Sequence, residues 1–183
     1  FDDIRSDMIR SLKNAIAQRP STQVVDDLNE SLLFGQWGEK ALISALETTD
    51  LSQLDGYIRQ FWRSASAEAL IYGNYEPGEA PQLSAMLQDI ISSDPAPTLP
   101  KRRVLRLAAG ESAQYVVDVP HDDSVVAWYL QGDGDTGYDR ATTALTAQIM
   151  SSGFFQELRT EQQLGYVVGA SSYSKLQVPG LLM

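Results

Sequence analysis

Apolar residues recur at one-turn intervals through the first half of the chain, and this period predicts amphipathic helices. The first run is Ile4, Met8, Leu12 and Ile16. Pro20 then either ends this helix or lies in the first turn of the next one, because proline does not continue a helix interior. The remaining runs predict helices around residues 24–32, 41–46, 54–62 and 83–90.

Two local signals refine this part of the chain. Asp50 precedes the helix around residues 54–62, and Gln53 follows it three residues later, which is the spacing of a capping box. The apolar positions of that helix are expected to be buried. The short run EALIY, residues 68–72, ends at a glycine and an asparagine and predicts one buried strand followed by a turn.

The period of the apolar positions becomes strand-like in the second half. The segment Ser92–Pro100 contains three prolines and no period, so we predict an interdomain link there. Adjacent strands followed by helices predict the α+β class, with helices packed on antiparallel sheets. The predicted elements are strands at 104–107, 114–119 and 124–131, a helix at 140–150, an interruption at 151–153, a helical piece ending near 163, and a strand from 166.

Composition and charge exclude several classes of partner. The chain has 183 residues and a formal net charge of -10. Contacts with nucleic acids and anionic lipids depend on Lys and Arg, so neither nucleic acid nor membrane is expected as a partner. The basic run Lys101–Arg103 is interpreted as a solvated strand edge.

The two ends of the chain leave its localisation open. No apolar stretch approaches the roughly 20 residues of a membrane-spanning helix, and no signal-peptide pattern is present. The chain starts at Phe1 inside a helical pattern and finishes with the apolar residues GLLM. We therefore expect both ends to be cuts through a longer protein.

Candidate catalytic groups are scarce. His121 is the single histidine and there is no cysteine. A zinc motif with two histidines on one helix and a thiol nucleophile are therefore excluded. A Ser-His-Asp triad would require His121, which lies in a predicted turn without an accompanying G-x-S-x-G elbow, so a solvated histidine is expected.

Three glycines at 132, 134 and 137 match G-x-G-x-x-G between a predicted strand and helix, and Glu157 follows about twenty residues later. This spacing resembles a dinucleotide fingerprint. However, Asp133 and Asp135 would face the pyrophosphate, and like charge opposes its binding. We favour a turn whose aspartates stabilise the start of a helix.

The same turn has the alternating aspartates of a calcium loop, namely Asp133, Asp135 and Asp139. The glutamate expected at the twelfth position is replaced by Ala144. Calcium is therefore not predicted.

Arg159 lies at the end of the last predicted helix, and Tyr166 lies at the start of the strand that follows. Gly165 is suited to a left-handed helix C-cap between them. Arg159 would either bind helix carbonyls or Glu161, or hold a ligand carbonyl or carboxylate. Tyr166 would either join the core or offer its hydroxyl to an oxyanion. The residue types alone favour the structural role, which is helix closure for Arg159 and the core for Tyr166.

The run LRTEQQLGYVV, residues 158–168, resembles the most recognisable motif in the C-terminal half of the insulinase/pitrilysin zinc metallopeptidases. The resemblance extends over nearly the whole chain in order. FDDIRSDMIRSLKNAIAQRP, ALISALETTDLSQLDGYIRQF and ALIYGNY resemble the end of the third of the four homologous domains in that family. The PKRR link, SVVAWYLQ and SSGFFQELRTEQQLGYVV resemble the start of the fourth.

This resemblance implies a division of the chain and of the chemistry. Residues 1–94 would be the helical C-terminal part of the third domain, and residues 95–183 the N-terminal part of the fourth. The zinc cofactor belongs to an H-x-x-E-H motif in the first domain of the family, so zinc is implied in the parent enzyme outside this chain. No catalytic residue and no metal ligand is predicted here, and the fragment alone is expected to be inactive.

The resemblance also assigns a role to the arginine and tyrosine of the motif. By motif position these are Arg159 and Tyr166, and their implied role is substrate binding near the scissile bond. A guanidinium suits a backbone carbonyl, and a phenol suits a carbonyl oxygen that develops negative charge. The implied partners are a peptide substrate and the N-terminal catalytic half, with this part forming the chamber wall.

Two expectations complete this interpretation, and one alternative stays open. Exposed strand edges are expected to pair between copies of the chain. A periplasmic location follows only if the source is bacterial and pitrilysin-like. The alternative is a catalytically inactive homologue that serves as a binding or assembly subunit, which an H-x-x-E-H motif in the parent would exclude.

Overall fold

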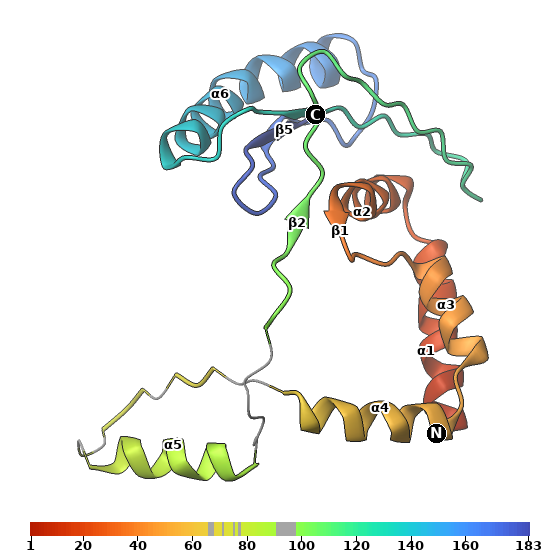
Figure 1. The fold of residues 1–183 in the computed structure, drawn as a ribbon. Coiled ribbons are helices and arrows are strands. Elements are labelled where there is room, and N and C mark those ends of the chain that lie inside the picture. The colour runs from red at the N-terminus through yellow and green to blue at the C-terminus, as the bar shows by residue number, and fades with distance from the viewer. Residues whose placement is uncertain (66–67, 71, 75, 77, 91–97) are drawn as a thin grey trace. The chain divides into compact units, whose positions relative to one another are not determined.

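The computed structural model divides into two compact units (Figure 1). One unit comprises Phe1 and Ala45–Lys101, and the other comprises Asp2–Ser44 and Arg102–Met183. The residues that the structure describes are 1–65, 68–70, 72–74, 76, 78–90 and 98–183.

The first half of the chain is helical, as the apolar period predicts. Pro20 is the first residue of its helix, where proline's missing N–H has no intrahelical partner to lose. Of the two places expected for Pro20, the first turn of the next helix is therefore confirmed. The helices are α1 (Asp2–Ile16), α2 (Pro20–Leu32), α3 (Glu39–Thr48), α4 (Leu51–Arg63) and α5 (Glu79–Ile90).

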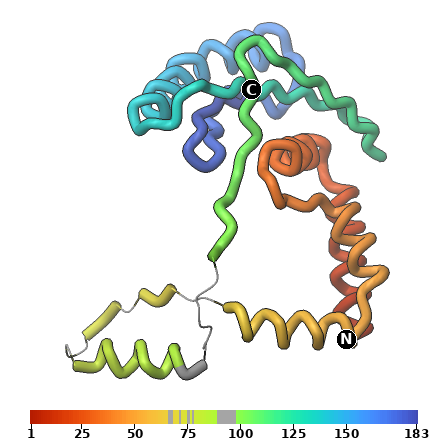
Figure 2. The backbone as a smooth tube through the Cα atoms, in the orientation of Figure 1, coloured from red at the N-terminus to blue at the C-terminus, as the bar shows by residue number. Residues whose placement is uncertain are grey.

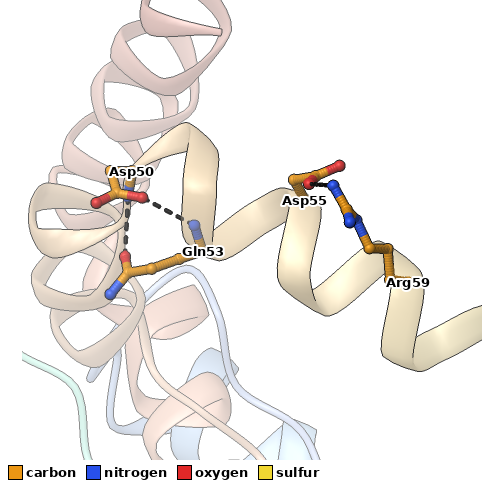
Figure 3. Close-up of polar contacts among 4 residues, drawn as sticks. All are labelled: Asp50, Gln53, Asp55 and Arg59. Carbon is orange, nitrogen blue, oxygen red and sulfur yellow. Dashed lines mark hydrogen bonds and ion pairs between the residues drawn. The ribbon is translucent and has the colours of Figure 1, made fainter.

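The predicted capping box at the start of α4 is confirmed (Figure 3). The backbone N–H of Gln53 donates to Asp50 Oδ1 at 2.8 Å. In return, the backbone N–H of Asp50 donates to Gln53 Oε1 at 2.9 Å. One turn later, Arg59 donates to Asp55 in an exposed ion pair of i,i+4 spacing.

The expected burial of the α4 apolar face is wrong for the described structure. Ile58 and Phe61 are 44% and 48% exposed, and Trp62 is 51% exposed. The strand predicted at residues 68–72 is also absent from the described part of that run, where Leu70 is 94% exposed, and Ile71 lies outside the described residues. An apolar helix face is buried, and a strand is formed, only when another segment packs against it or pairs with it. The local sequence does not supply that segment.

Two small antiparallel sheets lie in the second unit, which confirms the α+β class with antiparallel sheets. Strands β1 (Leu33–Phe34) and β2 (Arg103–Val104) form a pair. Strand β5 (Gly180–Leu182) lies between β3 (Tyr129–Gln131) and β4 (Ser171–Ser172).

Helix α6 (Gly137–Phe155) packs against β4 and β5 (Figure 1). Ala147 on α6 is buried, as are Ala170, Val178 and Pro179 beside the strands. These residues belong to the core of this unit. The sheet therefore determines the direction of α6, and α6 in turn leads to the motif at residues 158–168.

The observed strands are shorter than predicted. Residues 114–119 form no strand, and Figure 2 shows the chain running out from β2 and turning back toward β3. The side-chain amide of Gln131 substitutes for strand pairing next to β2. Its Oε1 accepts from Leu107 N–H and its Nε2 donates to the Leu105 carbonyl, both at 2.8 Å.

The predicted interruption at Ser151–Gly153 is wrong, because α6 passes through it without a break. A glycine in a helix interior costs only about 1 kcal/mol, which tertiary packing readily offsets. Beyond α6 the chain continues as the π-helical turn η1 (Gln156–Glu161). The strand predicted from residue 166 is also wrong, since β4 starts at Ser171.

The predicted domain boundary between residues 94 and 95 lies outside the described residues, as does most of the proposed link Ser92–Pro100. The division into residues 1–94 and 95–183 therefore stays a prediction. None of the helices within the described residues combines the length and apolar character required to cross a membrane.

Two glycine substitutions test the packing of α6 and β5. A Cβ on Gly180 would lie 2.4 Å from the ring of Tyr129, whereas a Cβ on Gly153 would have no atom within 4 Å. We expect Gly180→Ala to lower the free energy of unfolding by about 1–3 kcal/mol through overpacking. Gly153→Ala should raise it by about 0.5–1 kcal/mol through helix propensity. Urea unfolding followed by circular dichroism measures both, and equal effects would contradict the packing described here.

Candidate functional site

The motif at residues 158–168 begins in the π-helical turn at the end of α6. The backbone N–H of Gln162 donates to the Glu157 carbonyl at 2.9 Å, five residues back, and the N–H of Leu164 donates to the Leu158 carbonyl at 3.0 Å. The chain then leaves the helix at Gln163, which has φ 54°. The prediction of a left-handed Gly165 is wrong, because Gln163 takes that conformation at a cost of roughly 1–2 kcal/mol.

Arg159 and Tyr166 come together at this helix end. The Arg159 Cζ atom lies 4.5 Å from the centroid of the Tyr166 ring, a cation–π contact. Tyr166 is 89% exposed, and Arg159 is half-buried. The alternative in which Tyr166 joins the core is therefore wrong for this structure.

The alternative contact between Arg159 and Glu161 is also not formed among the described residues. The Glu161 carboxylate instead accepts from Gln156 Nε2 at 3.4 Å. A stacked guanidinium keeps its N–H edge available for a planar acceptor such as a carbonyl or carboxylate. The exposed phenol beside it is both a donor and an acceptor. Together they form a polar pair suited to a peptide backbone.

The glycine-rich turn before α6 is a helix cap. The backbone N–H of Asp139 donates to Thr136 Oγ1 at 3.2 Å, and the N–H of Thr136 donates to Asp139 Oδ2 at 3.0 Å. These hydrogen bonds from Thr136 hold the pKa of the Asp139 carboxyl below its ordinary value of 3.8. The predicted role of the aspartates at a helix start is confirmed for Asp139.

One glycine of this turn, Gly134, has a packing reason. A Cβ on Gly134 would lie 2.0 Å from the Asp139 carboxylate, so the close approach of the cap requires glycine there. The capping carboxylate occupies the space next to the first turn of α6. That arrangement favours the cap over the dinucleotide interpretation of the same glycines.

Sequence reasoning missed Arg106. Its guanidinium donates to the carbonyls of Asp133 and, at 3.5 Å, Gly134, and so fastens the turn to the segment after β2. Beside it is a hollow of about 550 Å³, lined by Arg102, Val104, Arg106, Asp135, Leu176, Gln177 and Val178. The sequence contained no signal for this contact beyond the alternation of Arg106 in a predicted strand.

A zinc site does not fit the residues of this chain. His121 is the single histidine, and its Nδ1 accepts from the backbone N–H of Asp123 at 3.0 Å in an exposed turn. Within the described ranges, no three His, Cys, Asp or Glu side chains gather in a way that would hold a metal ion. We therefore place no catalytic step of a metal on this chain.

Replacement of Thr136 tests the cap. Thr136→Ala should lower the free energy of unfolding by about 1 kcal/mol, because the first turn of α6 loses a hydrogen-bond acceptor. Thr142→Ala is the control in the same helix, and its effect should be neutral or slightly stabilising. Urea unfolding distinguishes the two, and an equal loss in both variants would contradict a specific capping role.

The pH dependence of stability gives a second test of the cap. Because the folded pKa of Asp139 is lowered, its contribution is present above the ordinary value of 3.8 and is lost as the pH falls through the folded pKa. The stability difference between the unmodified chain and Asp139→Asn should therefore shrink as the pH falls below about 4. Urea unfolding at stepped pH measures this difference. A gap that widens on acidification would contradict the assignment.

Comparison with known proteins agrees with the motif. The sequence profile of the family described as Peptidase M16 inactive domain matches residues 49–182. Insulin-degrading enzyme of Drosophila melanogaster is 27% identical over 176 residues, which cover 92% of this chain and 18% of that protein. A-factor-processing enzyme of Saccharomyces cerevisiae is 26% identical over 178 residues, which cover 94% of this chain and 17% of that protein.

Two further relatives, from Schizosaccharomyces pombe and Caenorhabditis elegans, carry the words zinc protease in their names and are 29% and 22% identical. The chain spans less than a fifth of the length of the first two relatives. Its match to the family nevertheless covers most of its own residues. The chain therefore belongs to the insulinase/pitrilysin family of zinc metallopeptidases and corresponds to the inactive domain in its C-terminal half.

Proposed function

We propose that this chain is the substrate-binding, non-catalytic part of a larger zinc endopeptidase that degrades oligopeptides. The names of the relatives support a peptidase, and the residues that the structure describes do not gather a set of possible zinc ligands. The metal would be held by the N-terminal catalytic half, which is one proposed partner. The other partner is the peptide substrate.

The observation that carries this proposal is the exposed pair of Arg159 and Tyr166. An arginine whose only role was to close a helix would be expected to bind helix carbonyls. Arg159 instead lies over a tyrosine ring at 4.5 Å, and that ring is 89% exposed. A guanidinium stacked on an aromatic face keeps its planar N–H edge for a carbonyl or carboxylate, which supports a binding role.

This pair has the chemistry needed to hold a peptide without reading its side chains. The guanidinium N–H groups of Arg159 would donate to a backbone carbonyl of the substrate. The Tyr166 hydroxyl would donate to a carbonyl oxygen and stabilise the negative charge that develops on it during hydrolysis. Zinc bound elsewhere in the protein would supply the activated water. The contribution of this chain is to grip and orient the substrate.

The role of this chain as a chamber wall is proposed from the family. The resemblance to that family implies that this half would close over the catalytic half. The net charge of this chain is -10, so a strongly acidic surface on the catalytic half would repel it and oppose docking. The fragment alone would not hydrolyse a peptide.

The pair is tested in the complete enzyme. Tyr166→Phe should lower kcat by about 100-fold with little change in KM, because it removes a donor to developing negative charge. Arg159→Lys should raise KM by about tenfold, because the planar fork is lost. Tyr138→Phe is the control, since Tyr138 on α6 is 79% exposed and has no proposed contact with substrate. Steady-state hydrolysis of a fluorogenic oligopeptide gives both constants.

Three results would overturn the proposal or replace it. Unchanged constants in both site variants would remove the role of the pair. Hydrolysis of a peptide by the 183-residue chain alone would show that the catalytic group lies within it. A complete protein that binds peptide without cleaving it would favour the alternative of an inactive binding or assembly subunit.

A further inference from the structure

We infer that Glu157 and Gln162 are positioning residues that hold the π-helical turn in shape and thereby keep Arg159 against Tyr166. The inference rests on the proposed function, because it explains how the substrate-binding pair is presented. Neither residue is assigned a contact with substrate. They act through the backbone that carries Arg159.

The first evidence is a pair of bonds that an α-helix does not allow. Successive residues of an α-helix are about 100° apart around its axis, so residues five apart are about 140° apart and their side chains do not meet. In this turn, Gln162 Nε2 donates to Glu157 Oε1 at 2.6 Å. Gln156 Nε2 donates to Glu161 Oε1 at 3.4 Å, at the same spacing. These bonds require the wide turn.

The second evidence is that Glu157 and Gln162 are joined twice. The backbone N–H of Gln162 donates to the Glu157 carbonyl at 2.9 Å, and its side-chain amide donates to the Glu157 carboxyl group. The bond between Gln156 and Glu161 is longer and therefore weaker. The Glu157–Gln162 pair is thus the stronger clamp on the turn.

The third evidence is the position of Arg159 relative to this clamp. Arg159 lies between the two clamped residues, and Tyr166 lies four residues beyond Gln162. Return of the turn to α-helical geometry would rotate the following chain by about 100° and shift it by about 1.5 Å. The 4.5 Å contact between the guanidinium and the ring would then be lost. Single π-helical turns of this kind occur frequently at functional sites.

The test is nuclear magnetic resonance of the full 183-residue chain, with the Nε–H signal of Arg159 as the probe. The signal is assigned by its loss in Arg159→Lys. The Tyr166 ring shifts the Arg159 signal, and Tyr166→Leu gives the position of that signal without the ring. We expect Glu157→Ala to move the signal to the Tyr166→Leu position. Glu157→Gln should leave it in place, because an amide oxygen accepts the same hydrogen bond.

Two further variants keep the test decisive. Gln162→Glu places two carboxylates opposite each other and should move the signal as Glu157→Ala does. If one of these two variants folds poorly, the other still gives the test. Asp55→Ala is the matched control, because it removes an exposed carboxylate that accepts a hydrogen bond within a regular α-helix. It should leave the Arg159 signal unchanged. An unmoved Arg159 signal in folded Glu157→Ala and Gln162→Glu would overturn the inference.

Kinetics in the complete enzyme separate this inference from the proposed function. Glu157→Ala should lower kcat/KM by about tenfold, and Glu157→Gln should stay within about twofold of the unmodified enzyme. If Arg159→Lys and Tyr166→Phe impair activity but Glu157→Ala does not, the positioning role is wrong and the proposed function stands. If Arg159→Lys and Tyr166→Phe are without effect, the proposed function fails first.

Discussion

The second unit depends on the close packing of strand β5 between its two neighbours. Gly180 allows the Tyr129 ring to lie where a side chain would otherwise be, at a distance that excludes even a methyl group. Pro179 and Val178, just before the strand, are buried with it. Because α6 packs on β4 and β5, the direction of that helix follows from the sheet that β5 holds together. The motif beyond α6 inherits its position from the same contact.

Side-chain hydrogen bonds define both ends of helix α6. At its start, Thr136 and Asp139 satisfy one another's N–H groups, and Arg106 holds the preceding carbonyls from outside. At its end, the turn widens by one residue, and Glu157 and Gln162 bond across it. The first device fixes where the helix begins, and the second fixes the direction in which the chain leaves it. Both use exposed polar residues that a pattern of apolar positions does not reveal.

Membership of the peptidase family and the geometry of the pair support different parts of the interpretation. The family match is to an inactive domain, so a single histidine and no cysteine are compatible with relatives that are named zinc proteases. It does not explain why Tyr166 is exposed or why Arg159 lies over its ring. Those features are properties of the helix end, and they are the physical basis of the proposal that this pair binds substrate. Under the proposed division, bond cleavage and substrate orientation would reside in different parts of one polypeptide.

The sequence by itself determined the features whose partners are a few residues apart. The helices, the capping box of Asp50 and Gln53, and the place of Pro20 at the start of α2 were all predictable, because their hydrogen bonds and spacing are local. Arg159 and Tyr166 were found from a motif, because their residue types alone favoured structural roles. The tertiary structure decided the rest. Strand lengths, exposure of the α4 face and the hold of Arg106 on the turn before α6 depend on which distant segments meet. The left-handed residue at Gln163 follows from a widened turn, which the period of an ordinary helix does not encode.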